Sequence, residues 1–441
     1  MNTPICDFVN QYQNSLPLRL HMPGHKGKAY LGCEGLDITE ISGADSLFEA
    51  DGIIAESEKN AGEIFGADTF YSTEGSSLSI RAMLHLAYLW AKMQGKTPLV
   101  AAGRNAHKTF LSAAALIDMD ILWLKGKSDE SYLSCTITPD SLEKTLKESS
   151  PAAVYITSPD YLGNTADIKA LSDICHKYGA LLLVDNAHGA YLKALNTHPI
   201  DLGADMCCDS AHKTLPVLTG GGYLHLAKTL PDFMRANAKR ALALYGSTSP
   251  SYLILQSLDM ANKCLADGLI CEIQAFAHQV EKLKNRLVNC GFTLFGNEPL
   301  KITIFAKKYG YSGTLLADML QKQNIHCEFS DPDFIVFMLT PQIGEEGLKT
   351  LENSLTAIEK KEEIQAHFPA FSQCKKVTSV RNAIFSPCET LPTEKALGKI
   401  LASPSVGCPP AVPIVICGEE IDSSAIEVFK YYGIKEVTVI K

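Results

Sequence analysis

The sequence predicts an α/β protein whose largest part is a mainly parallel β-sheet with helices on both faces. Between residues 98 and 225, short apolar runs typical of fully buried strands alternate with segments of helical periodicity. Strands are expected at 98–102, 121–124, 152–157, 181–185, 206–208 and 222–225, and helices at 108–117, 139–148 and 168–178. Ligands of such sheets bind beyond the carboxyl ends of the strands, so the residues that follow each strand are the first candidates for a site.

Residues 1–55 show turn chemistry rather than the periodicity of a helix or a strand. A Pro-Gly turn at 23–24 lies between His21 and His25 and presents polar groups. We expect either a plain surface arm or an arm that reaches into an active site, such as that of a neighbouring subunit.

The segment at 73–77, Thr-Glu-Gly-Ser-Ser, leads from a short extended segment at 69–72 into a long helix at about 77–94; another helix is expected at 56–66. Free amides at a helix N-terminus, the positive end of the helix dipole and nearby hydroxyls suit a phosphate. The candidate phosphate ligands are Gly75, Ser76 and Ser77, and the alternative interpretation is an ordinary serine cap.

The chain is expected to contain four parts: an N-terminal arm (1–55), a large cofactor-binding domain (56–250), a connector with a small α/β domain (251–370), and a C-terminal domain (371–441). The connector reads as a long helical region at 251–289. The small domain has strands near 292–295, 301–305 and 334–339, and the charged segment at 356–370 is expected to be helical.

Composition narrows the classes of partner and compartment. The net charge of −9 argues against a nucleic acid or a membrane surface as the main partner. The N-terminus lacks the pattern of a signal peptide, no apolar run is long enough to span a bilayer, and the 14 cysteines are scattered without a Cys-x-x-Cys pair. We therefore expect a cytoplasmic protein with reduced cysteines and no metal site.

Lys213 is the strongest candidate for a chemical role. It lies in the segment Asp-Ser-Ala-His-Lys-Thr at 209–214, just before a run of glycines at 220–222. A lysine in such a place can hold an aldehyde cofactor as a Schiff base, and pyridoxal 5′-phosphate (PLP) is the usual aldehyde. Taken alone, a solvated loop lysine is the commoner case, so the interpretation depends on the partners that PLP requires.

The chain supplies these partners in order. PLP needs a carboxylate at its pyridine nitrogen, and Asp185 ends the most apolar strand. It needs a flat group on one face of the ring, and His107 follows another strand. Its phosphate needs donors, for which the candidates are Gly75, Ser76, Ser77, Ser210 and His212. Singly, Asp185 could cap a turn and His107 could be an ordinary core histidine, but the joint pattern is far more specific.

On these residues, the chain resembles the PLP-dependent Orn/Lys/Arg decarboxylases of fold type I, the aspartate-aminotransferase-like fold, and among them the compact biosynthetic type. The resemblance covers nearly the whole chain and rests on motifs at 20–27, 37–40, 104–108, 157–163, 185–188, 210–214, 247–252, 409–410 and 418–419. Three positions depart from the family pattern: Glu74 replaces its usual Asn, Asn186 its usual Glu, and Ala411 its usual Gly.

The resemblance implies roles for individual residues. Lys213 would carry the cofactor, His107 would stack on the ring, Asp185 would pair with the pyridine nitrogen, and His188 would lie beside the cofactor. Ser76, Ser77, Ser210 and His212 would bind the phosphate. The family's dimer would bring residues 247–249 towards the partner's cofactor, so a homodimer or a dimer-based oligomer with shared active sites is expected.

The implied reaction is decarboxylation of arginine, lysine or ornithine to the amine, a step of polyamine biosynthesis. The distal cation of the substrate needs an acidic partner, for which the candidates are Glu40, Asp45, Glu328, Asp331 and Glu389. Two alternatives stay open: another fold-type-I reaction such as transamination or aldol cleavage, and a catalytically silent regulatory homologue. Transamination would need an arginine for the substrate carboxylate; none lies between Arg286 and Arg381, although Arg381 could serve.

Overall fold

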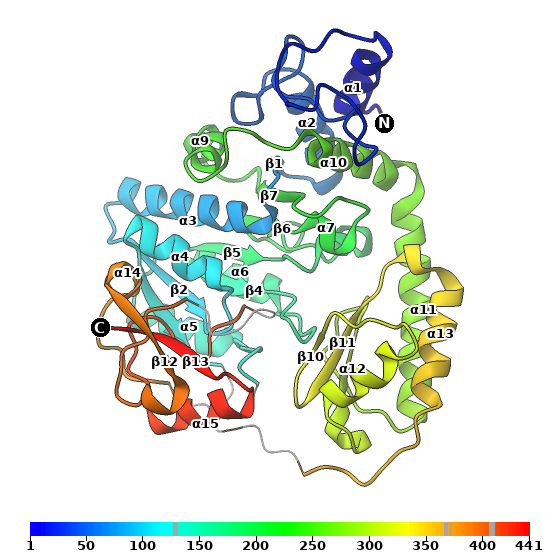
Figure 1. Ribbon diagram of the computed structural model, residues 1–441. Helices are drawn as coiled ribbons and strands as arrows, with labels where there is room; N and C mark the ends of the chain where they lie inside the picture. Colours follow the sequence, from blue (N-terminus) through cyan, green and yellow to red (C-terminus); the bar gives the residue numbers. More distant parts are fainter. Residues whose placement is uncertain (127–130, 366–368, 370–372, 405–410) are drawn as a thin grey trace. The chain divides into compact units, whose positions relative to one another are not determined.

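The computed structural model describes residues 1–126, 131–365, 369, 373–404 and 411–441 (Figure 1). These residues form two compact units. The first contains Met1–Thr97 and Ile168–Glu272, and the second contains Pro98–Asp167 and Ile273–Lys441. Both have strands with helices packed on them, so the predicted α/β class is confirmed.

The first unit is built on four strands in the order β1-β7-β6-β5. Their bounds are β1 Asp68–Ser72, β5 Leu181–Asp185, β6 Met206–Asp209 and β7 Gly222–Leu226. β5 and β6 are parallel, with Asp185 opposite Cys208, whereas β7 runs antiparallel to both β6 and β1. Every residue of β5, β6 and β7 is buried. Consequently, the carboxyl ends of β5 and β6 lie at one edge of the sheet, where the predicted Asp185 and Lys213 follow.

The longest helix on this sheet is α3 (Gly75–Met93), which packs against β5, β6 and β7 (Figure 1). The remaining helices of the unit are α1 Pro4–Asn14, α2 Ile53–Phe65, α6 Ile168–Lys177, α7 Ala211–Thr214, α8 Asp232–Ala236, α9 Ala238–Ala243 and α10 Tyr252–Cys264, with short helices η1 Leu47–Glu49, η2 Ala190–Leu195 and η3 Leu265–Leu269. In the described part of the chain, no helix combines the length and apolarity needed to cross a membrane.

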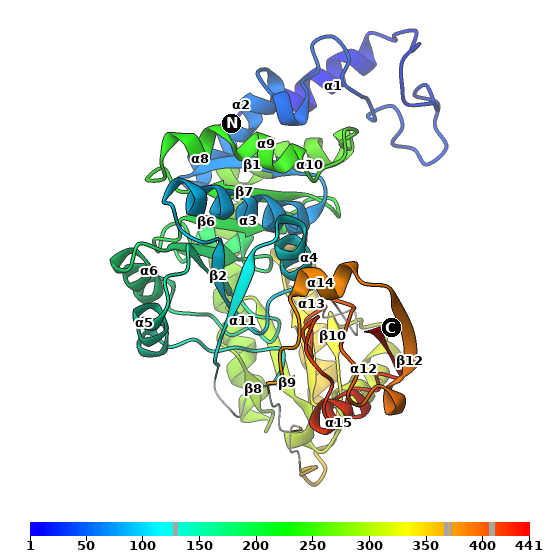
Figure 2. The same ribbon diagram turned by 90° about the vertical axis from the view of Figure 1, so that its left-hand side faces the viewer.

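The N-terminal segment is only partly the loop that the sequence predicts. Helix α1 was missed, and tertiary contacts explain why it forms: Ile5 and Val9 are fully buried. The backbone N–H groups of Ile5 and Cys6 both donate to Asp259 Oδ2 at 3.0 Å. After α1 the chain does run as an irregular arm up to α2, and Figure 2 shows it extending outward from the helices of this unit.

The second unit contains three parallel strands in the order β4-β2-β3, with bounds β2 Leu99–Gly103, β3 Asp120–Leu124 and β4 Ala153–Thr157. Helices α4 (Lys108–Ile117) and α5 (Pro139–Glu148) connect them. A second sheet is antiparallel, in the order β10-β11-β9-β8. It consists of β8 Leu294–Phe295, β9 Lys301–Phe305, β10 Phe329–Ser330 and β11 Phe334–Met338, with helices α11 Ile270–Asn289, α12 Gly313–Gln321 and α13 Gly344–Thr356 and short helices η4 Ala306–Tyr309 and η5 Pro341–Ile343.

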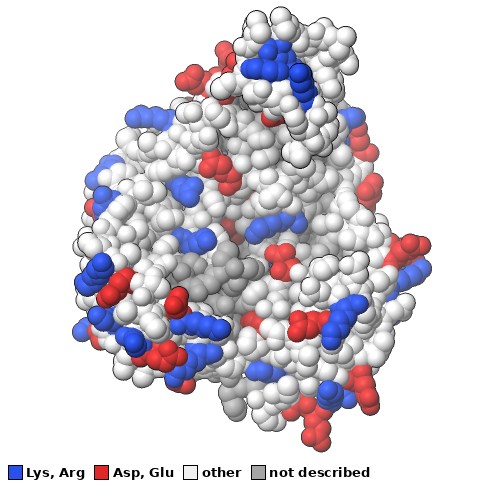
Figure 3. Space-filling model, in the orientation of Figure 1, with Lys and Arg blue, Asp and Glu red and all other residues white. Residues whose placement is uncertain are grey.

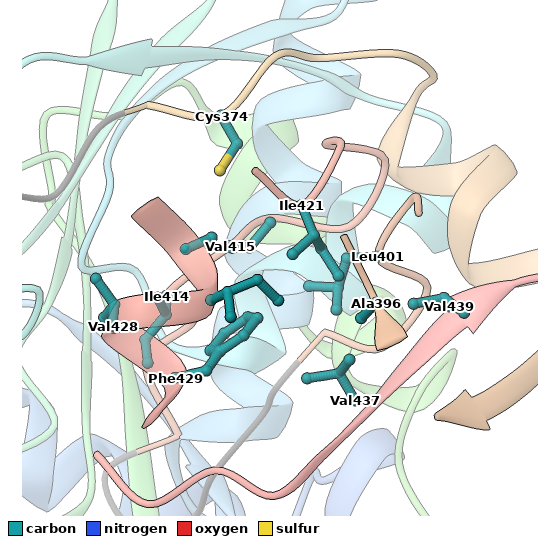
Figure 4. Close-up of a cluster of buried hydrophobic side chains, with 12 residues drawn as sticks. Cys374, Ala396, Leu401, Ile414, Val415, Ile421, Val428, Phe429, Val437 and Val439 are labelled. Carbon is teal, nitrogen blue, oxygen red and sulfur yellow. The ribbon is translucent and has the colours of Figure 1, made fainter. Parts of the chain in front are cut away.

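The C-terminal residues form a small hydrophobic core of their own (Figure 4). It is built on the hairpin-like pair β12 (Cys388–Pro392) and β13 (Glu436–Ile440), with α14 (Val380–Phe385), η6 (Thr393–Lys395) and α15 (Ser423–Tyr431). Phe429 from α15 packs among Leu401, Ile414 and Val437, and all four are buried.

Two further predictions need correction. The helical region expected at 251–289 is interrupted between α10 and α11, because Gly268 has φ of +143°, which favours glycine and breaks the helix. The helix expected at 356–370 is wrong for its described residues: α13 ends at Thr356. Beyond it, the backbone N–H groups of Lys361 and Ile364 donate to Tyr309 and Lys307 carbonyls instead of to a helical ladder.

Asp45 organises the start of α2. Its carboxylate accepts hydrogen bonds from five backbone N–H groups at 2.9–3.3 Å, and its side chain is buried. Burial by itself would raise the pKa of Asp45, but the N–H groups of Gly52 and Asp51, with further backbone donors, outweigh burial and hold the pKa below its ordinary value. The carboxylate is therefore a structural cap.

Asp45→Asn should lower the free energy of unfolding by about 2–3 kcal/mol at pH 7, because an amide cannot replace a charged acceptor of several hydrogen bonds. A carboxylate with a lowered pKa contributes stability above its unfolded pKa and loses it as the pH falls. The difference between the two proteins should therefore shrink below about pH 4. Urea unfolding at pH 7 and pH 3 measures it, and an equal difference at both values would contradict this role.

Candidate active site

Lys213 lies in the short turn of helix α7, between β6 and β7. The Lys213 N–H donates to the Ser210 carbonyl at 2.9 Å, and the His212 N–H donates to the Gly221 carbonyl at 3.2 Å, so the glycine run holds the turn. The Lys213 Nζ atom lies 3.0 Å from His188 Nε2. His188 is buried in the loop that follows β5. The structure thus places the predicted lysine and the predicted histidine in direct contact at the carboxyl ends of two parallel strands.

The predicted phosphate ligands gather beside this lysine. Gly75 begins α3 with φ of +63°, and a Cβ atom there would lie 3.5 Å from His212 Cε1. The Ser210 hydroxyl contacts both the Ser76 hydroxyl, at 2.9 Å, and the Ser76 N–H, at 3.3 Å. Ser77 is the next residue of α3. The arrangement of a long helix's N-terminus, two adjacent hydroxyls and an imidazole fits a phosphate group.

His212 is held in its neutral form near pH 7. Burial lowers its pKa, and the neighbouring Lys213 charge lowers it further. A hydrogen bond between its Nδ1 atom and the Gly221 carbonyl, at 2.9 Å, acts in the opposite direction. Because that carbonyl accepts, Nδ1 carries a proton, and Nε2 can donate to a phosphate oxygen only in the protonated ring, which the charge of a bound phosphate would favour by raising the pKa of His212.

Asp185 ends β5 and is buried. Its Oδ1 atom accepts hydrogen bonds from the Ala187 N–H, at 3.2 Å, and from the Cys208 thiol, at 3.6 Å. The carboxylate therefore has a fixed position at the same edge of the sheet as Lys213. Its role as the partner of a pyridine nitrogen stays a prediction.

His107 belongs to the second unit, where it caps α4. Its Nδ1 atom accepts a hydrogen bond from the Thr109 N–H at 3.2 Å, and this contact fixes the ring. The neighbouring Lys108 N–H donates to the carbonyl of Ala411 at 2.9 Å. Ala411 has φ of +58°, which explains why glycine is usual at this position in the family. The stacking of His107 on a cofactor stays a prediction, and the Pro-Pro motif at 409–410 lies outside the described residues.

Of the acidic candidates for a distal cation, Glu328 is the one whose carboxylate is both exposed and next to a strand-end loop. Tyr161, in the loop after β4, donates its hydroxyl to Glu328 Oε1 at 3.3 Å, and its ring packs against Phe329. Asp45 is used as a helix cap, as described above. Asp331 is buried and accepts backbone N–H groups of Asp333 and Phe334 at 2.7 Å.

Arg381 does not have the place that an aminotransferase would require. It donates to the Ala115 carbonyl at 2.6 Å and thus caps the C-terminal end of α4. His107 caps the other end of the same ten-residue helix, about 15 Å away. The proposed alternative role of Arg381 in binding a substrate carboxylate therefore has no support in its contacts.

Sequence reasoning missed two buried polar groups near strand ends. Arg104, after β2, forms a two-pronged ion pair with Glu419, with N–O distances of 2.6 and 3.2 Å. Asp209, the last residue of β6, accepts from His198 and His225. Glu419 and Asp209 both belong to motifs noted in the sequence. Their partners are distant in the sequence, so no local pattern could predict these contacts.

Asp331, which follows β10 in the antiparallel sheet, leads to a prediction about how stability depends on pH. Burial raises the pKa of Asp331 to about 7, and the nearby Asp333 charge adds to this rise. Because the folded protein holds this proton more tightly than the unfolded chain does, the free energy of unfolding should rise as the pH falls from about 8 to about 5. Asp331→Asn should stabilise the protein at pH 8 by up to a few kcal/mol and have little effect at pH 5.

Urea unfolding of both proteins at pH 5, 6, 7 and 8 measures this effect. Asp51→Asn is a control at an exposed aspartate. If Asp331→Asn has the same effect on stability at pH 5 and pH 8, the buried carboxylate does not titrate in this range.

Comparison with known families identifies one that matches most of the chain. The family model described as "Orn/Lys/Arg decarboxylase, major domain" matches residues 3–295. The protein YaaO of Bacillus subtilis, whose function is uncharacterized, is 30% identical over 97% of this chain and 93% of its own length. The arginine decarboxylase of Bacillus anthracis is 29% identical over 96% of this chain and 92% of its own.

Solved structures share the fold over nearly the whole chain. Lysine decarboxylase A of Pseudomonas aeruginosa superposes with a TM-score of 0.81 at 16% identity, over 99% of this chain and 80% of that one. The constitutive lysine decarboxylase of E. coli superposes with a TM-score of 0.73 at 18% identity, over 100% of this chain and 82% of that one. At these identities, the similarity shows a common fold.

Proposed function

Because the chain belongs to the Orn/Lys/Arg decarboxylase family, whose members are PLP-dependent amino-acid decarboxylases, we propose that it decarboxylates a basic amino acid, with arginine as the preferred substrate. The observation that carries the proposal is the contact of Lys213 Nζ with His188, beside Ser76, Ser210 and His212. Arginine is favoured because several relatives that align over nearly the full chain are arginine decarboxylases.

The residues of the first unit fit PLP. Gly75 lets the chain turn into α3 with a left-handed backbone, its N–H donates to the Gly220 carbonyl at 2.6 Å, and without a side chain it leaves the space in front of His212 open to a phosphate. Gly75, Ser76, Ser77, Ser210 and His212 are the proposed phosphate ligands, and Lys213 the proposed covalent attachment. PLP, when bound, supplies an electron sink that stabilises negative charge at the substrate Cα. The Asp185 carboxylate keeps the pyridine nitrogen protonated for that purpose.

Three groups are proposed to handle protons: His188, Lys213 and His107. His188 Nε2, 3.0 Å from Lys213 Nζ, can accept a proton from the ammonium and so keep the amine nucleophilic. When carbon dioxide leaves, Cα must receive one proton in its place. We assign this proton to Lys213 Nζ or His107, and both histidines are proposed to lie beside the cofactor.

The contacts of the arginines favour decarboxylation over transamination. An aminotransferase holds the substrate carboxylate firmly, whereas a decarboxylase gains from leaving it poorly stabilised. There is no arginine between 286 and 381 in the sequence, and Arg381 is committed to the α4 carbonyls. Arg286 is paired with Glu352 at 2.5 and 2.8 Å.

We assign the distal guanidinium or ammonium of the substrate to Glu328. Its carboxylate is exposed, and one oxygen accepts a long hydrogen bond, 3.3 Å, from the Tyr161 hydroxyl. A guanidinium could displace the tyrosine contact and bind both oxygens.

The exposed apolar arm between α1 and α2 supports a dimer as part of the proposal. The arm between α1 and α2 is held by its own polar contacts, such as His25–Asp37 at 3.1 Å and Arg19 with the Gly35 carbonyl at 2.7 Å. Several of its large apolar side chains nevertheless face solvent, with Leu16 87% and Leu31 90% exposed. A homodimer, or a larger assembly of dimers, would cover them. A cytoplasmic location and a role in polyamine biosynthesis are part of the same proposal.

Carbon dioxide release from arginine, lysine and ornithine, assayed in parallel with added PLP, tests the function. We expect release from at least one, fastest from arginine. Lys213→Ala should lower turnover by several orders of magnitude while its circular dichroism spectrum stays unchanged, because the covalent attachment is lost. Retained turnover in this variant would refute the assignment of Lys213.

The same assay separates the alternatives. Formation of a keto acid without carbon dioxide would select transamination, and aldehyde release would select aldol cleavage. A folded protein that takes up no PLP, seen as no new visible absorbance, would favour the silent regulatory homologue.

Glu328→Gln should raise KM for the preferred substrate on the order of tenfold to a hundredfold with a smaller change in kcat, because it removes a charge partner remote from the reacting atoms. Glu346→Gln is a matched control at an exposed glutamate of the second unit that is not among the candidates for the distal cation. An unchanged KM for Glu328→Gln would place the distal cation elsewhere.

A further inference from the structure

A buried polar network lies directly behind the proposed cofactor site in the first unit. At its centre, the Asp209 carboxylate is completely buried at the end of β6. Its Oδ2 atom accepts from His198 Nε2 at 3.1 Å and from His225 Nε2 at 3.2 Å. Its Oδ1 atom accepts from Asn186 Nδ2 at 2.7 Å and from the Cys207 thiol at 3.6 Å. The network thus joins the residue after Asp185 to the residue before Ser210.

The hydrogen-bond partners of the His198 and His225 rings indicate which ring nitrogen carries the proton. The Ile200 N–H approaches His198 Nδ1 at 3.4 Å, so that nitrogen is an acceptor and Nε2 carries the proton towards Asp209. Burial lowers the pKa of His225, so its ring is neutral; because Nε2 carries the proton towards Asp209, Nδ1 accepts from the Thr69 hydroxyl at 2.9 Å. Burial by itself would raise the pKa of Asp209, but the His198 and His225 contacts outweigh it and hold the pKa below its ordinary value. The network therefore carries one fixed negative charge.

A metal ion is the other interpretation of this cluster. Ligand atoms of His198, Cys207 and Asp209 lie within 4.8 Å of one another. Coordination would require the Nε2 atom of His198 without its proton and the Cys207 thiolate. The Nε2 proton is used in a hydrogen bond, and burial raises the pKa of Cys207 well above its ordinary value. The hydrogen-bonded network accounts for the positions of these atoms without an ion.

Asn186 is the residue through which the network reaches the site. Its N–H donates to the Cys208 carbonyl at 3.0 Å, and its carbonyl accepts from the Gly189 N–H at 2.7 Å. A Cβ atom on Gly189 would lie only 2.0 Å from Asn186 Oδ1, so the loop closes tightly over this side chain. The same loop carries His188, the partner of Lys213.

We propose that the Asn186–Asp209 hydrogen bond is the positioning contact that sets the spacing between the loop carrying Asp185 and His188 and the turn carrying Ser210 and Lys213. It rests on the proposed function, since those four residues are the assigned cofactor ligands. The fixed charge of Asp209 favours an amide donor at position 186, because an acidic side chain there would bring a second carboxylate against it. Neither residue touches the cofactor, and both act through the residues beside them.

A charge exchange tests the contact. Asn186→Asp places two carboxylates at hydrogen-bonding distance in the core. It should raise the Kd for PLP on the order of tenfold to a hundredfold, the range for losing a buried hydrogen bond to a charged group. It should also shift the visible absorbance band of the bound cofactor. In the double variant Asn186→Asp/Asp209→Asn, the new amide can donate to the new carboxylate, so most of the affinity and the original band should return.

Asn262→Asp is the matched control. Asn262 is also a fully buried asparagine of the first unit, and its Nδ2 atom donates to the Tyr71 hydroxyl at 2.6 Å and to the Ser57 carbonyl at 3.1 Å. Its substitution should lower the thermal stability of the apo protein and leave the Kd for PLP and the absorbance band unchanged.

Each outcome decides one claim. Asn186→Asp with lowered stability but an unchanged Kd and band would overturn the positioning role, and so would a double variant that recovers neither. A wild-type protein that takes up no PLP would overturn the proposed function, and this inference with it. Zinc bound in stoichiometric amount by purified wild-type protein would replace the hydrogen-bonded network with a metal site.

Discussion

The parallel pairing of β5 with β6 is the constraint on which the candidate site depends. Asp185 lies opposite Cys208 in this pairing, so both strands end at one edge of the sheet. The loop after β5 and the turn after β6 are therefore neighbours, and Lys213 reaches His188. A shift of one residue in the pairing would turn Asp185 to the other face of the sheet and separate the groups that the chemistry needs.

The sequence predicted most strands, because fully buried strands are short apolar runs whose composition differs from that of the helices between them. The candidate site also followed from local chemistry: the turn at Gly75 and the lysine turn after β6 can each be read within a few residues. Helix α1 was missed because its stability comes from a distant carboxylate, Asp259. The Asn186–Asp209 contact joins residues 23 apart, and single-sequence patterns do not show such pairs.

Acidic residues in this protein serve two different purposes. Several are used by the fold: Asp45 caps a helix, Glu419 pairs with Arg104, and Asp209 holds two histidines. On the face shown in Figure 3, acidic and basic side chains are interspersed rather than gathered by sign. A carboxylate is therefore a candidate ligand for a substrate cation only where the fold has not already used it. This argument, rather than sequence position, separates Glu328 from Asp45 and Asp331.

The tight approach of Gly189 to the Asn186 side chain has a consequence for divergence and for protein engineering. The Asn186 side chain leaves no room for a side chain at position 189. It also donates to the Asp209 carboxylate, so a second negative charge at position 186 would be repelled. A substitution at one of these positions alone would give an unfavourable intermediate sequence. We therefore expect relatives of this protein to change the three residues together or to keep all three. A combinatorial library that randomises the three codons together would sample sequences that stepwise mutagenesis cannot reach.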